Sequence, residues 1–458
     1  MSDVILDAAE GVIIPVHLLR EADVDAALAA LTDQGRGLAA LHEFKGKAGQ
    51  VLLVPDAHGA TERVLFGLGQ ARASGVRALA AKLPKGNYEI VEGPTDISAD
   101  EAALAFALGS YRFDRYKKKP DERPRLVARG ADVAAVRAMA HACALARDMI
   151  NTPPNDMGPL QIETIAREIA EQHGAAITVV TGEGLLEANY PAVHAVGRAA
   201  AAGREPRMIE MTWGKASDPL VAIIGKGVVF DTGGLDIKPS AGMRLMKKDM
   251  GGAAHALALA RMVMAAGLAV RLLVLTPTVE NSISGEAMRP GDVIDSRKGL
   301  TIEVGNTDAE GRLILADALT RAAEFSPDLT LDLATLTGAA RVALGPQLPP
   351  FMTDDEELAA AIMAASEAVE DPLWRLPLWK GYAEALDSDV ADLKNDPDAW
   401  AQAGAVTAGL FLQRFAPEGA WAHLDIFAWN PRAKPGVPAG GEVMAIRALF
   451  RMLQDRYK

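Results

Sequence analysis

The sequence predicts an α/β protein in which a smaller N-terminal α/β domain is joined by a helix to a larger C-terminal α/β domain with a mostly parallel central sheet. Three observations predict this fold. Short apolar runs alternate with helical stretches rich in alanine and leucine along the chain. The 458 residues exceed one typical domain. Half of the residues are hydrophobic and 23% are charged, as in ordinary globular proteins.

The N-terminal domain is expected to cover residues 1–130. Strand-like apolar runs occupy residues 11–16, 50–55, 63–66 and 88–91. Helical stretches between them occupy residues 23–31, 75–83 and 99–107. A connecting helix is expected over residues 131–150, because apolar residues recur there at helical spacing and Pro153 and Pro154 forbid its continuation.

The C-terminal domain is expected to cover residues 151–458. Its strand candidates are residues 208–213, 220–224, 271–276, 301–304, 329–333 and 423–427. Helices expected at residues 253–266 and 313–324 fall between these strands. This alternation predicts a largely parallel sheet.

Charge and cysteine content exclude several classes of protein. The net charge of -13 disfavours general binding to nucleic acid or anionic membranes. Cys143 is the only cysteine, so no intrachain disulfide forms and a reducing compartment is expected. The N-terminus lacks the pattern of a secretory signal, and no apolar run reaches the length of a membrane span. The expected location is the cytoplasm, and the basic segment 117–120 is expected to be a solvated loop.

Three polar clusters are interpreted as following predicted strands, and sites in α/β proteins form at the carboxyl ends of strands. The first, GKGVVFDTGG at residues 225–234, carries Lys226 and Asp231 between glycines that permit a sharp turn and a close approach to a bound group. It lacks the spacing of a phosphate-binding loop. Alone, it could equally be a turn with a surface lysine and a capping aspartate.

The second cluster, KKDMGGAAH, contains Asp249, which could simply cap the following helix. The third, NTDAEGRL, contains Asp308, Glu310 and Arg312, which would share one face if this segment were extended. Two crowded carboxylates repel each other unless a cation lies between them. The alternative interpretation is a polar loop that opens a helix.

Together, the four acids Asp231, Asp249, Asp308 and Glu310 supply enough oxygen ligands for two divalent cations. Such ligands suit Zn, Mn, Mg or Co, and ligand type alone does not choose among these metals. The HExxH pattern of single-zinc peptidases is absent from the sequence, and the eight histidines are widely scattered.

These clusters resemble the signature of the leucyl aminopeptidase family of dinuclear-metal exopeptidases. The resemblance covers the second domain and makes it the catalytic domain; NTDAEGRL is its most specific motif. It implies that Lys226, Asp231, Asp249 and Glu310 bind one metal, and that Asp231, Asp308 and Glu310 bind the other. The implied reaction releases N-terminal amino acids from peptides by attack of a water molecule that bridges the metals.

The resemblance also implies further residues and partners. Lys238 would polarise the scissile carbonyl, and Arg312 would hold a bicarbonate ion that serves as general base. Met246, Thr335 and Gly338 would line the pocket for the N-terminal side chain. The implied assembly is a homohexamer.

Two rival functions and one departure from the family pattern accompany this hypothesis. A two-metal phosphatase would share the carboxylates, and a non-catalytic or DNA-binding scaffold would share the fold. Glu442 stands where relatives have a small neutral residue in a turn that completes the pocket. Because glutamate is mostly exposed in proteins, we expect Glu442 to face solvent and the pocket to prefer apolar residues such as leucine and methionine.

Overall fold

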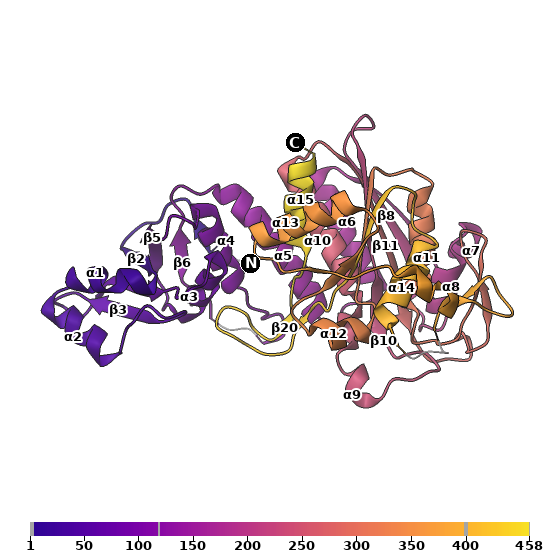
Figure 1. The fold of residues 1–458 in the computed structure, drawn as a ribbon, viewed down its shortest axis with the longest axis horizontal. Helices are drawn as coiled ribbons and strands as arrows, with labels where there is room; N and C mark the ends of the chain where they lie inside the picture. Colours follow the sequence, from indigo (N-terminus) through magenta and orange to yellow (C-terminus); the bar gives the residue numbers. More distant parts are fainter. Residues whose placement is uncertain (1–3, 118–119, 398–401, 458) are drawn as a thin grey trace. The chain divides into compact units, whose positions relative to one another are not determined.

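A computed structural model of the chain describes residues 4–117, 120–397 and 402–457 (Figure 1). The chain divides into two compact units. The first consists of Met1–Ala144 and Asn430–Ala439, and the second of Leu145–Trp429 and Gly440–Lys458. Two lysines of the basic segment expected to be a loop, Lys118 and Lys119, lie outside the described residues.

The first unit is built on a sheet with the strand order β1-β6-β5-β2-β4-β3 within the described residues. Only the pairing of β3 with β4 is antiparallel there. Its strands are β1 Ile5–Leu6, β2 Ile13–Leu19, β3 Val51–Pro55, β4 Thr61–Gly67, β5 Asn87–Glu92 and β6 Arg125–Val127. Its helices are η1 Glu21–Asp23, α1 Val24–Ala29, α2 Asp33–Leu41, η2 Ala73–Val76, α3 Arg77–Lys82 and α4 Ala99–Gly109.

The helix expected before Pro153 is present as α5, Val133–Asn151. It begins in the first unit and ends in the second. The prolines that follow it lack the backbone N–H that a continuing helix requires, which accounts for where it ends.

The second unit contains a larger sheet with the order β16-β15-β18-β14-β9-β11-β8-β7, and β10 also pairs with β11. The central pairs β18–β14, β14–β9 and β9–β11 are parallel, as predicted. Antiparallel pairs occur toward the edges. The strands are β7 Ala176–Thr181, β8 Arg207–Trp213, β9 Leu220–Gly225, β10 Gly227–Asp231, β11 Arg271–Asn281, β14 Leu329–Ala334, β15 Pro350–Met352, β16 Trp374–Arg375 and β18 Ala420–Asp425.

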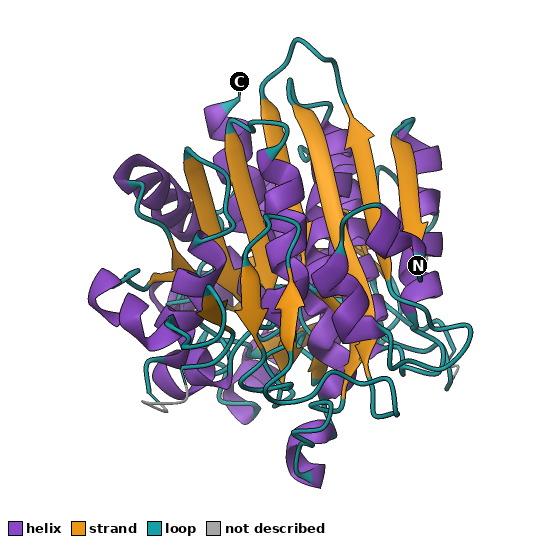
Figure 2. Cartoon of the chain, turned by 90° about the vertical axis from the view of Figure 1, so that its right-hand side faces the viewer, coloured by secondary structure: helices purple, strands orange, loops and turns teal. Residues whose placement is uncertain are grey.

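Helices cover both faces of this sheet, which Figure 2 shows as orange strands between purple helices. Helices α6, α10, α13 and α15 form one layer, and α8, α11 and α14 form the other. The helices of this unit are α6 Pro159–His173, α7 Gly184–Glu187, α8 Pro191–Gly197, α9 Ser240–Met243, η3 Met246–Met250, α10 Gly251–Ala266, α11 Gly311–Ala323, α12 Gly338–Leu344, α13 Glu356–Ala368, η4 Lys380–Leu386, α14 Gly404–Gln413 and α15 Ile446–Arg456.

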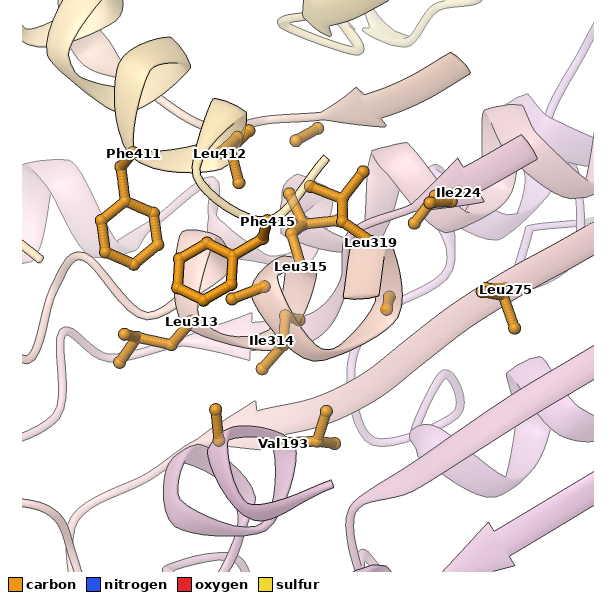
Figure 3. Packing of buried hydrophobic residues seen from close by; sticks show 14 of the residues in the cluster. Val193, Ile224, Leu275, Leu313, Ile314, Leu315, Leu319, Phe411, Leu412 and Phe415 are labelled. Atoms are coloured by element: carbon orange, nitrogen blue, oxygen red, sulfur yellow. The ribbon is translucent and has the colours of Figure 1, made fainter. Parts of the chain in front are cut away.

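The core of the second unit explains why β9 lies at the centre of the sheet. All six residues of β9 are buried, because helices cover both of its faces. Ile224 belongs to a cluster with Leu315 and Leu319 of α11, to which Phe411 and Phe415 also belong (Figure 3). This packing fixes the amino end of α11 against the sheet, and that end carries part of the candidate site.

The strand expected at residues 301–304 forms, but it does not join the central sheet. It is β13, Thr301–Glu303, in a small sheet with β12, Val293–Asp295, and β17, Leu393–Lys394. The remaining short strands are β19, Trp429–Asn430, and β20, Gly440–Gly441. Among the described residues, no helix is both long enough and apolar enough to cross a membrane.

Candidate metal centre

Lys226 lies where the backbone passes from β9 to β10. Both strands pair in parallel with β11 at the same register. Strand β10 therefore continues the direction of β9, with a break at Lys226. The Lys226 N–H donates to Leu333 O at 3.0 Å, and its carbonyl accepts from Ala253 N at 2.8 Å. The backbone therefore makes no sharp turn at Lys226 and instead bridges β14 and the start of α10.

Two glycines allow the helices to approach Lys226. A Cβ on Gly252 would lie 2.1 Å from Leu333 O and 2.6 Å from Lys226 N, so no side chain fits there. A Cβ on Gly311, at the start of α11, would lie 2.6 Å from Lys226 Nζ. The side chain of Lys226 thus occupies the space that the missing side chain of Gly311 leaves open.

The four acids predicted as ligands lie around two lysines. Lys226 Nζ is 2.7 Å from Asp249 Oδ2 and 2.9 Å from Glu310 Oε1. Lys238 Nζ is 2.8 Å from Asp231 Oδ2 and also pairs with Asp308 Oδ1. These acids stand in three separate clusters of the sequence, and the fold brings all of them together.

Burial and mutual repulsion shift the pKa values of these acids. Burial and the nearby Asp231 carboxylate raise the pKa of Glu310 to about 8 and that of Asp308 to about 6. Burial opposes ionisation of Asp249 as well, but Lys226 outweighs it and the pKa of Asp249 is lowered. The crowded carboxylates therefore repel one another enough to favour binding of cations.

The carboxylate cluster fits divalent cations. One oxygen each from Asp231, Asp308 and Glu310 lie within 4.8 Å of one another. Both oxygens of Glu310 are buried and, within the described residues, accept no hydrogen bond; the contact with Lys226 is an ion pair by distance only. Buried oxygens without a donor are rare in proteins, and a metal ion would satisfy them.

One local expectation from the sequence is wrong, and the structure decides two alternatives that the sequence left open. The segment with Asp249 does not follow a strand: it lies in η3, after the short helix α9. Asp249 does not cap α10, because its Oδ1 instead accepts from the Thr335 hydroxyl at 2.8 Å. Residues 308–312 are not extended: Asp308 lies in a turn, while Glu310 is the residue before α11 and Arg312 lies in its first turn.

Arg312 is buried beside the carboxylates. Its Nη1 donates to Asn395 O at 2.6 Å. Its Nε finds no hydrogen-bond partner in the part of the chain that the structure describes. Burial lowers the pKa of the guanidinium, although Asp396 and Glu310 oppose that effect. This side chain thus has a donor available for an anion.

The residues expected to line the pocket occupy neighbouring elements. Met246 begins η3 and is partly buried, and Thr335 follows β14 and is buried. Gly338 is exposed at the start of α12. Thr335 is tied to the centre, because its hydroxyl donates to both the carbonyl and the carboxylate of Asp249.

Comparison with known proteins identifies the family. The catalytic domain of the cytosol aminopeptidase family matches residues 144–450, which is more than half of the chain. The chain belongs to the cytosol aminopeptidase family. The N-terminal domain of M17 aminopeptidases matches residues 14–128. The resemblance to leucyl aminopeptidases is thereby confirmed.

Individual relatives of this cytosol aminopeptidase agree. A probable cytosol aminopeptidase of Syntrophotalea carbinolica is 38% identical over 449 residues, which is 90% of each chain. The crystal structure of the cytosol aminopeptidase from Coxiella burnetii is 42% identical, covers 99% of this chain and 100% of its own, and has a TM-score of 0.94. The bottromycin maturation enzyme BotP in complex with Mn is 35% identical, covers 97% and 99%, and has a TM-score of 0.87.

The protein is a metal-dependent aminopeptidase that uses divalent cations and acts on peptides. The family and the two-domain α/β fold of its relatives confirm the predicted fold class and activity. They decide against the phosphatase and against a purely structural scaffold.

One expectation about the aminopeptidase pocket is wrong. The Glu442 side chain does not face solvent: it is 12% exposed, and its Oε2 lies 3.4 Å from Nη2 of Arg147, which is 1% exposed. Arg147 Nε also donates to Gly441 O at 3.1 Å. Glu442 is therefore a partly buried carboxylate that is paired with a buried arginine.

The residues that hold the acids of the aminopeptidase centre in place were not predicted from the sequence. Asn281 Nδ2 donates to Asp231 Oδ1 at 2.8 Å and to Thr307 O at 3.1 Å. The Thr307 hydroxyl accepts from Asp236 N at 2.9 Å, which fixes the loop before Lys238. The available signal is that Asn281 is a polar residue at the end of β11, and sites in α/β proteins form at the carboxyl ends of strands.

Proposed function

We propose that this aminopeptidase binds two divalent cations, Zn or Mn with Mg or Co as alternatives. Lys226, Asp231, Asp249 and Glu310 would hold one cation, and Asp231, Asp308 and Glu310 the other. The observation that carries this proposal is the buried Glu310 carboxylate, whose two oxygens accept no hydrogen bond from the described residues. The similar enzyme BotP forms a complex with Mn, which supports manganese.

When bound, the two cations supply Lewis acidity, which activates a water molecule and polarises the peptide carbonyl. Asp249, Glu310 and Asp231 raise the pKa of Lys226 above its ordinary value although burial opposes the charge. With these carboxylates neutralised by cations, that effect is removed. The amine of Lys226 can then lose its proton, as a metal ligand must.

Lys238 is proposed to bind the scissile carbonyl oxygen. Its ammonium is partly buried between Asp231 and Asp308, which raise its pKa despite burial. Unlike Lys226, it is not a proposed metal ligand, and the ordinary pKa of a lysine is enough to keep its proton at neutral pH. A fixed positive donor at this place would stabilise the negative charge that develops on the carbonyl oxygen in the transition state.

Arg312 is proposed to hold a bicarbonate ion that accepts a proton from the attacking water. The support is its burial beside Glu310 together with an Nε donor that has no partner among the described residues. A guanidinium suits a planar, doubly accepting anion. Arg312 itself then neither gains nor loses a proton in the reaction.

The pocket for the N-terminal side chain is proposed to comprise Met246, Thr335 and Gly338. A flexible methionine beside small residues suits leucine, methionine and other apolar side chains. We further propose that residues 151–458 form the catalytic domain, that residues 131–150 connect it to residues 1–130, and that the chains form a cytoplasmic homohexamer. Family membership supports these assignments.

Hydrolysis of L-leucyl-p-nitroanilide tests the proposal. Chelation with EDTA is expected to abolish release of p-nitroaniline, and addition of Mn²⁺ or Zn²⁺ to restore it. Metal content, measured by elemental analysis on the same samples, should reach two ions per chain at full activity. Full activity in protein shown to be free of metal would contradict the proposal.

A further inference from the structure

Lys248 carries a buried ammonium group that the mechanism above does not use. Its side chain is 3% exposed, and within the described residues its Nζ donates no hydrogen bond. It pairs with Asp249 Oδ1 at 3.8 Å, beyond hydrogen-bond distance, and that oxygen already accepts from Thr335. A buried ammonium with three unused donors is costly, which points to an acceptor that binds there.

Arg341 brings a second cation to the same place. Its guanidinium carbon lies 4.4 Å from the centroid of the Phe427 ring, and Lys248 Nζ lies 5.4 Å from that centroid. In the part of the chain that is described, the guanidinium of Arg341 makes neither a hydrogen bond nor an ion pair. Two cations with unused donors thus meet at one aromatic ring.

The remaining carboxylate nearby, Asp425, is already occupied. Its Oδ1 accepts from Leu336 N at 3.0 Å and from Thr337 N at 3.1 Å, while its Oδ2 accepts from the Thr337 hydroxyl at 2.6 Å. Asp425 therefore lowers the cost of the buried charges without using their donors. The two cations still lack an oxygen acceptor among the described residues.

These cations flank the loop from Thr335 to Gly338. Lys248 and the Thr335 hydroxyl both approach Asp249 Oδ1. Arg341 Nη2 lies 3.6 Å from the position that a Cβ on Gly338 would take. An anion held by Lys248 and Arg341 would therefore lie at the pocket proposed for the N-terminal side chain.

We propose that Lys248 and Arg341 bind the carboxylate of an acidic N-terminal residue, so that the enzyme releases glutamate and aspartate as well as apolar residues. The proposal rests on the proposed aminopeptidase pocket. Hydrogen bonds between charged groups, beside the Phe427 ring that both cations contact, supply the selectivity. A carboxylate could also come from the C-terminus of a dipeptide substrate, and the test separates these two sources.

The test compares α-L-glutamyl-p-nitroanilide with its neutral isostere L-glutaminyl-p-nitroanilide on the Mn-loaded enzyme. We expect kcat/KM to favour the glutamyl substrate about tenfold, as one charged hydrogen bond of about 1.4 kcal/mol gives. In Lys248→Met the ratio should fall to about one. Lys247→Met is the matched control and should keep the ratio, because Lys247 Nζ instead donates to Asn151 O at 2.6 Å.

Each outcome bears on one assignment. A glutamyl-to-glutaminyl ratio of one in the wild type, or a ratio that Lys248→Met leaves unchanged, would overturn the acidic subsite while leucyl-p-nitroanilide turnover upholds the aminopeptidase. Absence of leucyl turnover would overturn the proposed function itself. If Lys248→Met fails to fold by circular dichroism, Arg341→Gln carries the same comparison. Lys248→Met could instead lower kcat/KM for the dipeptide Leu-Gly and leave that for leucyl-glycinamide unchanged. This result would show that the bound carboxylate is the C-terminal one of a dipeptide, and it would overturn the side-chain assignment.

Discussion

At the residue scale, the pairing of Glu442 with Arg147 determines whether this carboxylate can attract a basic substrate. Because Arg147 already neutralises Glu442, no free carboxylate is left to attract a basic substrate. We therefore expect wild-type kcat/KM for leucyl-p-nitroanilide to exceed that for arginyl-p-nitroanilide about tenfold or more, since burying an unpaired charge costs above about 1.4 kcal/mol. Glu442→Ala should change this ratio little. A strong arginyl preference that disappears in Glu442→Ala would contradict this account.

Substitution of a ligand acid should remove bound metal as well as activity, whereas substitution of Lys238 should remove activity alone. Glu310→Gln is expected to lower metal content and kcat together, because Glu310 is proposed to touch both cations. Lys238→Met should retain metal while kcat falls about 10²–10³-fold, the usual cost of one transition-state donor. Elemental analysis of folded variants measures the difference. Metal loss in Lys238→Met would make Lys238 a ligand instead.

The charged residues of the metal centre could be predicted from the sequence. The residues that hold these carboxylates in place by hydrogen bonds could not. The acids stand in short motifs with glycines, and any cation site needs such oxygens. Asn281 and Thr335 are common residue types, and their function depends on which distant carboxylate they meet. The sequence predicts Glu442 at the surface because glutamate is mostly exposed in proteins, and its partner Arg147 lies too far away in the sequence to indicate otherwise.

At the scale of elements, helix α11 and the β9–β10 line are coupled through Gly311. In Gly311→Ala the new methyl group would contact the flexible end of Lys226, so we expect the fold to survive with a loss of metal binding and activity. In Gly252→Ala the contacts are with backbone atoms that cannot move, so unfolding should be easier by about 1–3 kcal/mol. Thermal unfolding and elemental analysis of both variants separate the effects. Equal destabilisation of Gly311→Ala and Gly252→Ala would show that the Lys226 side chain cannot move away from the new methyl group.

Helix α10 is joined to the C-terminal segment by His255, whose neutral form is required. Its Nδ1 bonds to Gly251 O at 2.6 Å, and its Nε2 accepts from Met444 N at 3.0 Å. Burial lowers the pKa of His255 to about 4. The unfolded chain thus binds a proton that the folded chain does not, and this stability, present above pH about 6.5, is lost as pH falls toward 4.

This titration predicts that the free energy of unfolding depends on pH more strongly in the wild type than in His255→Gln. From pH 7 to pH 4 the wild type should lose about 3 kcal/mol of unfolding free energy more than His255→Gln, whose side chain has no proton to gain. Urea unfolding at several pH values measures both. Parallel curves for the two proteins would show that His255 does not titrate in this range.

The strands of the central sheet were more predictable than the helices. Apolar runs located β9, β14 and the first part of β11, since burial on both faces leaves a clear pattern. Helices α6, α8 and α12–α15 were not predicted. The run at β13 looks the same in sequence, but it pairs with β12 and β17 outside the central sheet. Pairing partners are distant in the chain, and a local pattern does not identify them.

For the whole molecule, the family assignment predicts assembly. Six chains of 48.3 kDa would give a particle of about 290 kDa. We expect light scattering coupled to size exclusion to find this mass at micromolar concentration, with the net charge of -13 keeping the particles soluble. A stable monomer with full leucyl activity would contradict the hexamer while leaving the catalytic assignment intact.

The contacts of residues 440–444 have a consequence for the timing of synthesis. Gly441 N donates to Asn151, Glu442 pairs with Arg147, and Met444 N donates to His255. A ribosome delivers this segment long after α5 and α10 have emerged. The surroundings of α10 therefore stay incomplete on a nascent chain until residues 440–444 have also left the ribosome.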